Sequence, residues 1–417
     1  MAKKVVIIGG GIMGLSCAYF LHKEGCQVSV LDRSGMDTGA SYVNAGYLTP
    51  SHIIPLASPG MMAKGLKWMF NSSSPFYLKP RWDWDFFRWA WYFHRSATPE
   101  KVARAIPLIA EINVLSKELY REWHQSGDFG GFQLEEQGLL MLYKTAAARR
   151  SEKAVMDRAL ELGLEARDLS AAELTALQPG LDPAIDGAIH YLCDAHTTPT
   201  QLMPRLRTYL ERSGVQIQPH TEVTDFTHNG GKISEVRAGE KRFAADEVVL
   251  AAGSWSPVLG KKLGLRIPLQ AGKGYRINVS RPTPVRLPAI LMEAKVAVTP
   301  MEGFTRFAGT MELSGINHRI RRNRVEAIAR SASEYYSGFR IEDEEITAAA
   351  CGLRPVSPDG LPYIGRYPGW DNFSLATGHA MMGWSLGPVT GKLISELLCG
   401  KPYSMSLDAF RPDRRFV

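Results

Sequence analysis

A buried strand, a glycine-rich turn and a helix open the chain, and this order constrains the fold more than any other feature. Residues 5–8 form an apolar run that predicts a strand; Gly9, Gly11 and Gly14 follow with the spacing Gly-x-Gly-x-x-Gly, and a helical pattern continues to about Gly25. Glycines at this spacing allow a tight turn, a close approach of backbone to a pyrophosphate and close packing of helix on sheet. The segment therefore predicts a dinucleotide site at the helix N-terminus.

An acidic residue supports this interpretation. Residues 27–31 predict a second strand, and Asp32 stands at its end, where a carboxylate can accept hydrogen bonds from both ribose hydroxyls. Arg33 by itself would favour the phosphate of NADP, but an acid in the ribose position argues against that. The fingerprint alone leaves the choice among dinucleotides and chemistries open.

Composition indicates an ordinary soluble protein of two or three domains, with 417 residues, 45% hydrophobic and 22% charged. The net charge of +7 is mild, and no Lys/Arg-rich run suggests nucleic acid. Its sign favours an anionic substrate or an acidic membrane surface. Five widely spaced cysteines without a Cys-x-x-Cys pair predict reduced thiols and no metal site. Because no signal peptide or membrane span is recognisable, we expect a cytoplasmic location.

Aromatic residues crowd residues 81–95. At helical spacing one face would carry Trp82, Phe86, Trp89 and Phe93, and the same stripe would be widened by Trp84, Phe87 and Trp91. A stripe this wide is usual for a helix buried in its own domain. Tryptophans flanked by arginines also suit the headgroup level of a bilayer, with Trp89 and Trp91 facing lipid. Both interpretations stay open.

The other patterns outline two sheets. Residues 246–253 read as a parallel strand buried on both faces, whereas strand-like segments dominate residues 266–349 and suggest a mainly antiparallel sheet. Helices are expected at 100–125, 146–163, 201–212 and 324–336. The small-residue loop 38–50 is either a surface turn or a second backbone contact to a ligand. Residues 378–383 are expected to open a final helix whose N-terminus faces an electron-rich ring oxygen.

Five separated motifs together resemble the FAD-dependent amine oxidoreductases typified by D-amino acid oxidase and glycine oxidase. The motifs are Gly9-x-Gly11-x-x-Gly14 with Asp32, Ser41-x-x-Asn44-Ala45-Gly46, Ala251-Ala252-Gly253-Ser254-Trp255, Gly352-Leu353-Arg354-Pro355 with Asp359-Gly360, and Gly378-His379 with Gly383. Length, the aromatic insertion after residue 56, Lys273-Gly274-Tyr275 and residues 378–383 are more similar to bacterial D-amino acid dehydrogenases than to the oxidases.

This resemblance implies an α/β chain with an α+β second domain. A Rossmann-like FAD-binding domain would comprise residues 1–56, 187–265 and 350–417, and an interleaved substrate domain, residues 57–186 and 266–349, would be built on a mixed, mainly antiparallel sheet. Contacts to FAD are implied for Gly9, Gly11, Ile12, Met13, Gly14, Asp32, Arg33, Ser41, Asn44, Ala45, Gly46, Tyr47, Leu48, Val223, Ala252, Gly253, Trp255, Arg354, Gly378, His379, Met381, Met382, Gly383 and Trp384.

The resemblance also implies roles for single residues. In the family pattern the arginine corresponding to Arg354 pairs with the substrate carboxylate, for which a planar guanidinium is well suited; a structural salt bridge is the alternative. Further candidates for the catalytic site are Tyr275 and His379, with Glu312 and His52 as weaker ones. Met381 stands where glycine oxidase-like members carry an arginine, which leaves a more apolar pocket.

The expected reaction is oxidative deamination of an amino acid, either a D-amino acid or a cyclic proline-type one. A hydride would pass from the α-carbon to flavin N5, and the electrons would pass to a quinone or respiratory carrier, with residues 81–95 as a contact to the inner face of the cell membrane. Two alternatives remain at this point. One is an oxygen-using amino acid, glycine or sarcosine oxidase, and the other is a non-catalytic flavin-dependent binding or assembly protein.

Overall fold

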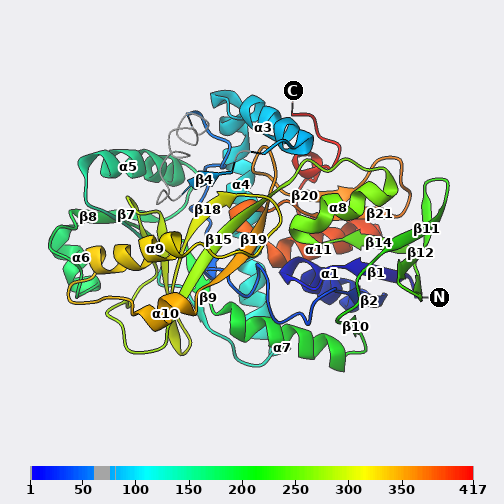
Figure 1. The fold of residues 1–417 in the computed structure, drawn as a ribbon, viewed down its shortest axis with the longest axis horizontal. Helices are drawn as coiled ribbons and strands as arrows, with labels where there is room; N and C mark the ends of the chain where they lie inside the picture. Colours follow the sequence, from blue (N-terminus) through cyan, green and yellow to red (C-terminus); the bar gives the residue numbers. More distant parts are fainter. Residues whose placement is uncertain (1, 61–75, 80, 417) are drawn as a thin grey trace.

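The computed structural model describes residues 2–60, 76–79 and 81–416. Figure 1 shows the blue N-terminal and red C-terminal segments side by side at one end of the molecule, with strands from the middle of the chain between them. The other end carries a second large sheet with α5, α6 and α9. Segments far apart in the sequence therefore build each end.

Within the described residues, the first sheet has six strands in the order β10-β2-β1-β14-β21-β20. All neighbours are parallel except β20 and β21. The bounds are β1 Lys4–Ile8, β2 Gln27–Leu31, β10 Gln216–Gln218, β14 Glu247–Leu250, β20 Tyr363–Arg366 and β21 Phe373–Thr377. Every residue of β14 and β21 is buried, as the uniform apolar run predicts for a parallel strand covered on both faces.

Different layers cover the two faces of this sheet. Val5 and Ile7 pack with apolar residues of α1 Ile12–Lys23, α4 Pro99–Ser126, α7 Pro199–Arg212 and α11 Gly387–Cys399. Val6 and Ile8 pack instead with the antiparallel ribbon of β11 Asp225–Asn229, β12 Lys232–Ala238 and β13 Lys241–Ala244. The alternation along β1 thus divides its side chains between a helical layer and a β layer.

The second large sheet is mixed and mainly antiparallel. Its order is β19-β15-β18-β17-β16-β6-β8-β7, and β4 pairs with β18; the parallel pairs are β16 with β6 and β18 with β4. The bounds are β4 Phe76–Leu78, β6 Leu139–Tyr143, β7 Ala166–Ser170, β8 Gly187–Tyr191, β15 Gln270–Val279, β16 Ala289–Leu291, β17 Val296–Met301, β18 Phe304–Leu313 and β19 Ala350–Val356. β8 and β19 begin at residues 187 and 350, where the expected domain boundaries lie, and both belong to this sheet.

Shorter elements complete the chain. A three-stranded sheet consists of β3 Tyr47–Leu48, β9 Ala195–Thr197 and β5 Leu134–Glu135. The Tyr47 hydroxyl shares its one proton between the carbonyl oxygens of Ala289 and Val298, at 2.8 and 2.9 Å, and so connects this sheet to β16 and β17. The remaining helices are α3 Trp84–Ser96, α5 Ala146–Glu161, α6 Ala171–Leu177, α8 Ser256–Gly260, α9 Arg322–Tyr335 and α10 Asp343–Thr347, with 3₁₀ turns η1 Gly253–Trp255, η2 Lys261–Leu263, η3 Ala380–Met382 and η4 Asp408–Phe410.

The final helix begins later than expected. The sequence suggests a start within residues 378–383, but η3 occupies this segment and α11 starts only at Gly387, with Pro388 in its first turn. Ala380 has a φ of +48°, which a continuous right-handed helix does not allow. The expected start within residues 378–383 is therefore wrong, because α11 begins at Gly387.

Helix α3 has one buried and one exposed side. Phe86, Trp89 and Phe93 are buried, and the Trp89 indole nitrogen donates to the carbonyl of Val356 at 2.9 Å. A second group of apolar side chains is exposed to solvent: Trp82 at 95%, Trp84 at 84%, Trp91 at 55% and Phe87 at 38%. The expectation that Trp82 shares the buried face is wrong, because it lies two residues before the helix, and Trp89 does not face outward. Of the described helices, none is long and apolar enough to cross a bilayer.

The two sides of α3 predict opposite responses to mutation. Trp89→Ala should lower the free energy of unfolding by about 3–5 kcal/mol, since it leaves a cavity in the core. Trp84→Ala should change it by less than about 0.5 kcal/mol, because that side chain is exposed. Chemical denaturation of both variants beside the unmutated protein measures the difference, and equal losses would contradict the described orientation of the helix.

Candidate active site between the two sheets

A cavity of about 1170 Å³ runs from the carboxyl ends of β1, β2 and β14 to the face of β15, β18 and β19. Ligand pockets for drug-sized molecules measure roughly 300–1,000 Å³. The cavity therefore has room for a ligand of dinucleotide size together with a smaller molecule. Its position at the carboxyl ends of parallel strands is where open α/β sheets bind ligands.

The glycine turn forms one end of this cavity. The Asp32 carboxylate accepts hydrogen bonds from the backbone of Gly10 at 2.6 Å and of Ser34 at 2.8 Å, so it stands at the cavity wall beside the turn. Gly11 caps α1 without a side-chain hydrogen bond, and the Ser41 hydroxyl accepts from the Ile12 N–H at 3.0 Å. Loop 38–50 thus reaches the helix N-terminus, which favours its second interpretation, a contact to the ligand.

The glycines fit a bound pyrophosphate. A Cβ at Gly14 would lie 1.8 Å from the Gly9 carbonyl oxygen, so the close packing of turn and helix requires glycine there. A Cβ at Gly11 would meet only the Ser41 hydroxyl, at 3.3 Å, and would otherwise project into the cavity. Gly11 is therefore needed for the space that a ligand takes, and Gly14 is needed for the fold itself.

An aromatic stack follows the turn. The Arg33 guanidinium lies 4.0 Å from the ring centre of Trp255, and the Trp255 ring stacks on His318 with centroids 6.0 Å apart and planes 16° apart. All three residues line the cavity. Arg33 thus makes a cation–π contact with Trp255.

Arg354 lies at the other end of the cavity. Its Nη1 donates to the carbonyl of Thr310 at 2.9 Å, and the guanidinium crosses Gly274 so closely that a Cβ there would lie 2.1 Å from Nη1. Among the described residues Arg354 forms no ion pair with an acidic side chain. The alternative role, a structural salt bridge, therefore finds no acidic partner in this part of the chain. Burial lowers the pKa of Arg354 to about 10. The side chain therefore remains a cation at neutral pH, held at the cavity wall.

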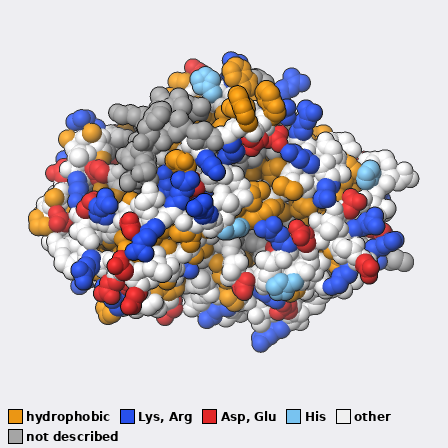
Figure 2. Space-filling view, viewed as in Figure 1, with side chains coloured by type: hydrophobic (Ala, Val, Ile, Leu, Met, Phe, Trp, Pro, Cys, Tyr) orange, Lys and Arg blue, Asp and Glu red, His pale blue; other side chains and the backbone are white. Residues whose placement is uncertain are grey.

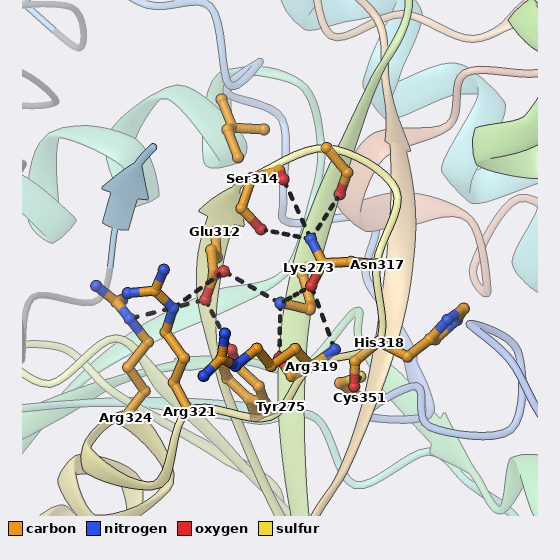
Figure 3. Close-up of polar contacts among 12 residues, drawn as sticks. Lys273, Tyr275, Glu312, Ser314, Asn317, His318, Arg319, Arg321, Arg324 and Cys351 are labelled. Atoms are coloured by element: carbon orange, nitrogen blue, oxygen red, sulfur yellow. Dashed lines mark hydrogen bonds and ion pairs between the residues drawn. The ribbon is translucent and has the colours of Figure 1, made fainter. Parts of the chain in front are cut away.

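A buried ionic cluster lies behind this wall (Figure 3). The Glu312 carboxylate accepts from the Tyr275 hydroxyl at 2.7 Å and pairs with Lys273 at 3.1 Å. Arg321 and Arg324 approach the same carboxylate at 3.5 and 3.8 Å. Burial opposes the ionisation of Glu312, but hydrogen bonds from Ser314, Tyr275 and Lys273 outweigh it and hold the pKa below its usual range.

This cluster changes the expectations for two candidates. Glu312 does not line the cavity, and its surroundings are those of a structural carboxylate. Tyr275 lines the cavity, but its hydroxyl donates to Glu312. Lys273 Nζ also donates to Asn317 Oδ1 and to the Arg319 carbonyl, both at 2.7 Å. The cluster therefore fixes the loop after β18, from which His318 reaches the cavity.

His379 and His52 both line the cavity as neutral imidazoles. His379 shares a hydrogen bond between its Nε2 and the Thr390 hydroxyl at 2.9 Å, and its buried Nδ1 has no hydrogen-bond partner among the described residues. Burial lowers the pKa of His379 to about 3 and that of His52 to about 4. Neither histidine is therefore a resident cation at neutral pH.

Most residues that the sequence singles out meet at this cavity. The wall includes Gly9, Gly11, Ile12, Met13, Asp32, Arg33, Ser41, Asn44, Ala45, Tyr47, His52, Val223, Ala252, Gly253, Trp255, Tyr275, Arg354, His379, Met381, Met382, Gly383 and Trp384. The wall does not include Gly14, Gly46, Leu48, Gly378 or Glu312.

Sequence reasoning missed part of the wall. The cavity is also lined by Met141, Glu152, Ile290, Met292, His318 and Ser385. Met141 belongs to β6, and the uniformly apolar sequence of this strand does not say which of its side chains face a ligand. Pairing of β6 with β16, which are far apart in sequence, brings Met141 opposite Ile290.

Replacement of Gly11 tests whether the turn holds a dinucleotide. Gly11→Ala should fold normally, because its φ of −75° suits alanine and the added Cβ has space. It should lose at least about tenfold in affinity for FAD, the dinucleotide that the resemblance implies, since each 1.4 kcal/mol of steric cost is a factor of ten. Titration of the apoprotein with FAD, followed by flavin fluorescence, measures this. Gly14→Ala, in contrast, should lower thermal stability, and unchanged FAD affinity in Gly11→Ala would contradict the assignment.

Comparisons with known proteins agree with the geometry. The chain is 32% identical to the D-amino acid dehydrogenase of Granulibacter bethesdensis, covering 95% of this chain and 96% of that protein, and 29% identical to that of Helicobacter pylori, covering 95% of each. Its fold is similar to that of glycine oxidase from Geobacillus kaustophilus, with a TM-score of 0.79 and 22% identity over 99% of this chain and 100% of that one. L-Proline dehydrogenase from P. horikoshii gives a TM-score of 0.76 at 16% identity, over 99% and 97% of the two chains.

The family comparison covers almost the whole chain. Residues 4–397 match the DAO family, described as FAD dependent oxidoreductase. The match confirms the expected mixed α/β fold and FAD as the cofactor. The chain therefore belongs to the DAO family of FAD-dependent oxidoreductases.

Proposed function

We propose that this protein catalyses the oxidative deamination of an amino acid, with a preference for D-amino acids, and passes the electrons to a quinone or respiratory carrier. The observation that carries the proposal is Arg354, a cation on the cavity wall with a backbone carbonyl as its hydrogen-bond partner and no acidic side chain paired with it in the described chain. The names of the relatives that are 29–32% identical support the choice of substrate.

The geometry around Arg354 suits a substrate carboxylate. A guanidinium offers several N–H groups in one plane, and the bond to Thr310 uses one of them. A carboxylate can pair with two others in a bidentate arrangement. Gly274 leaves the space in which the guanidinium lies flat on β15.

Different residues along the cavity would bind the cofactor and the substrate. The N-terminus of α1 would hold the pyrophosphate of FAD and Asp32 its ribose, while Arg354 would orient the amino acid at the far end. FAD, when bound, supplies the acceptor for the hydride. We also propose the discontinuous division into an FAD-binding and a substrate domain, since residues of both large sheets line the cavity.

An apolar wall suggests the kind of side chain that the substrate carries. Met141, Ile290, Met292 and Met381 line the cavity, and methionine side chains adapt to ligands of different shape. The proposal is therefore an amino acid with an apolar side chain or a cyclic one, not glycine.

The exposed side of α3 supports a membrane contact. Figure 2 shows hydrophobic side chains gathered over α3 with Lys and Arg beside them. Trp82, which precedes α3, and Trp84 and Trp91 of α3 are exposed. Arg88 and Arg95 belong to α3 as well. Tryptophans with neighbouring cations favour the interface of an anionic bilayer. Docking there would bring the protein to a quinone dissolved in lipid.

The first experiment is a screen of D-, L- and cyclic amino acids by anaerobic flavin reduction, followed by the variant Arg354→Met. We expect D-amino acids to bleach the flavin, and the variant to raise KM by roughly 10- to 100-fold, because a hydrogen bond to a charged group contributes about 1.5–3 kcal/mol. The KM of Arg354→Lys should lie between those of the unmutated protein and Arg354→Met, because the lysine keeps the charge but cannot form the bidentate pair.

Three outcomes would speak against parts of the proposal. Unchanged kinetics in a folded, yellow Arg354→Met variant would remove Arg354 from the substrate site. Stoichiometric peroxide in air without an added acceptor would favour the oxygen-using oxidase. If no amino acid bleached the flavin, catalysis on amino acids would be excluded and a flavin-dependent binding protein would be favoured.

Membrane contact has a separate test. The protein should sediment with vesicles that contain phosphatidylglycerol, and the triple variant of Trp82, Trp84 and Trp91 to serine should lose this binding, because it removes the exposed aromatic side of α3. Tyr403→Ser is the matched control, since Tyr403 is 49% exposed elsewhere on the chain. Equal sedimentation of the triple variant and the control would exclude this docking surface.

A further inference from the structure

A chain of three polar side chains leads from the cavity into the protein. His52 lines the cavity, and its Nδ1 lies 3.2 Å from the Ser51 hydroxyl. The Ser51 hydroxyl donates to Asp194 Oδ2 at 2.5 Å, and the Ser51 backbone N–H donates to Asp194 Oδ1 at 3.0 Å. Asp194 is fully buried. The arrangement connects a cavity-facing imidazole to a carboxylate that the solvent does not reach.

The direction of these hydrogen bonds sets the tautomer of His52. When Asp194 is ionised it can only accept, so the Ser51 hydroxyl donates its one proton to Asp194. Ser51 must then accept from His52, which places the imidazole proton on Nδ1. The Nε2 of His52, which has no hydrogen-bond partner within the described residues, is left with a free lone pair.

His52 and Arg354 line the same cavity. Residues 54–56, which begin two positions after His52, also line the wall. Ala57 packs in one apolar cluster with Val356, two residues beyond Arg354. An amino acid held by Arg354 through its carboxylate would occupy the cavity that His52 also lines.

We propose that His52, Ser51 and Asp194 form a proton relay that accepts the proton of the substrate's ammonium group. The inference rests on the proposed function, since it assigns an acceptor for a proton that the reaction must remove. Loss of a hydride from the α-carbon needs the nitrogen lone pair, and an ammonium group has none available. His52 is the residue that touches the substrate, and Ser51 and Asp194 act through it.

The transfer is balanced over three bonds. The ammonium N–H bond breaks as a bond from the proton to His52 Nε2 forms. The Nδ1 proton of His52 moves to the Ser51 oxygen, and the Ser51 hydroxyl proton moves to Asp194 Oδ2. The products are a neutral amine, a neutral imidazole and a neutral carboxylic acid, so no charge remains isolated in the interior.

The proton affinities of the two ends favour the relay over His52 alone. Burial lowers the pKa of His52 to about 4, so an imidazolium would be a poor resting place for the proton. Burial raises the pKa of Asp194 to about 7, although the hydrogen bonds from Ser51 act in the opposite direction. Asp194 is therefore the stronger base of the two.

Other groups around Asp194 leave it as the acceptor. The Cys193 thiol donates to Asp194 Oδ1 at 3.5 Å, and burial raises the pKa of that thiol above its usual range. Lys117 donates to the Cys193 carbonyl at 2.8 Å and pairs with Glu136 at 3.1 Å, so its charge is shared with another carboxylate. The hydroxyls of Tyr47 and Tyr191 donate to Val298 and Glu152.

The test is the pH profile of kcat/KM for the holoenzyme with D-alanine and a dye acceptor. The unmutated enzyme should lose activity below pH about 7, where Asp194 binds its proton and the relay is full. Asp194→Asn should shift this acid limb to the pKa of the substrate ammonium. The amide oxygen of the asparagine would accept from the Ser51 N–H, so its amide nitrogen would donate to the Ser51 hydroxyl. The hydroxyl would then donate to His52 Nδ1, which places the imidazole proton on Nε2. A protonated Nε2 cannot accept the substrate proton.

The expected loss depends on pH. Asp194→Asn should lower kcat/KM by about 100-fold near pH 7.5, within the usual range for acid–base catalysis, and the loss should vanish above the pKa of the substrate amine. Ser51→Ala breaks the same relay and should shift the acid limb in the same way. It replaces Asp194→Asn as the test if that variant does not fold. Cys193→Ala removes a hydrogen bond that lowers the pKa of Asp194 but leaves the relay intact, so its acid limb should move slightly upward and not to the pKa of the substrate ammonium.

Binding of pyruvate separates the relay from a structural role. Pyruvate has a carboxylate but no amine, so its binding requires no proton transfer. The dissociation constant of pyruvate, measured from the perturbation of the flavin spectrum, should therefore agree within about twofold among all variants. A loss of activity by the same factor at every pH, or no loss at all, would overturn the relay. If no amino acid reduces the flavin of the unmutated enzyme, the proposed function itself fails. That result differs from an active enzyme whose variants lose activity by the same factor at every pH, which would contradict the relay alone.

Discussion

The pairing of β15 with β18 on one side and β19 on the other is the interaction on which the far end of the cavity depends. Its register sets Lys273 opposite Glu312 and Gly272 opposite Arg354. Removal of one partner of a buried ion pair leaves an uncompensated charge, which is strongly destabilising. The Lys273–Glu312 pair therefore opposes any slip of these strands, and a slip would also displace Arg354 from its place across Gly274.

Features that depend on neighbours in the sequence could be predicted. The strand, the glycine turn, the helix, the second strand and Asp32 lie within 30 residues, and short-range steric rules determine their order. The apolar run of β14 likewise indicated a strand buried on both faces. In α3, periodicity identified the helix but not its orientation, because tryptophan occurs on both the buried and the exposed side.

Features that depend on distant partners could not be predicted. Glu312 resembled a candidate for the active site until its pairing with Lys273 and Tyr275 placed it behind the wall. Asp194 and Ser51 are 143 residues apart, and no local pattern joins them. The sequence that follows Asp194 indicated only a helix at residues 201–212. Charged side chains of this kind acquire their roles from the long-range strand pairing that brings them together.

The strand order of the first sheet has a consequence for synthesis of the chain. β1 pairs with β14, and β14 pairs with β21, which ends at Thr377. β1, the first strand to leave the ribosome, thus keeps one edge unpaired until β14 has been synthesised, which requires more than half of the chain. Pairings of such long sequence separation fold slowly, and unpaired apolar edges promote aggregation. The nascent protein is therefore expected to need shielding by chaperones until its C-terminal segment emerges.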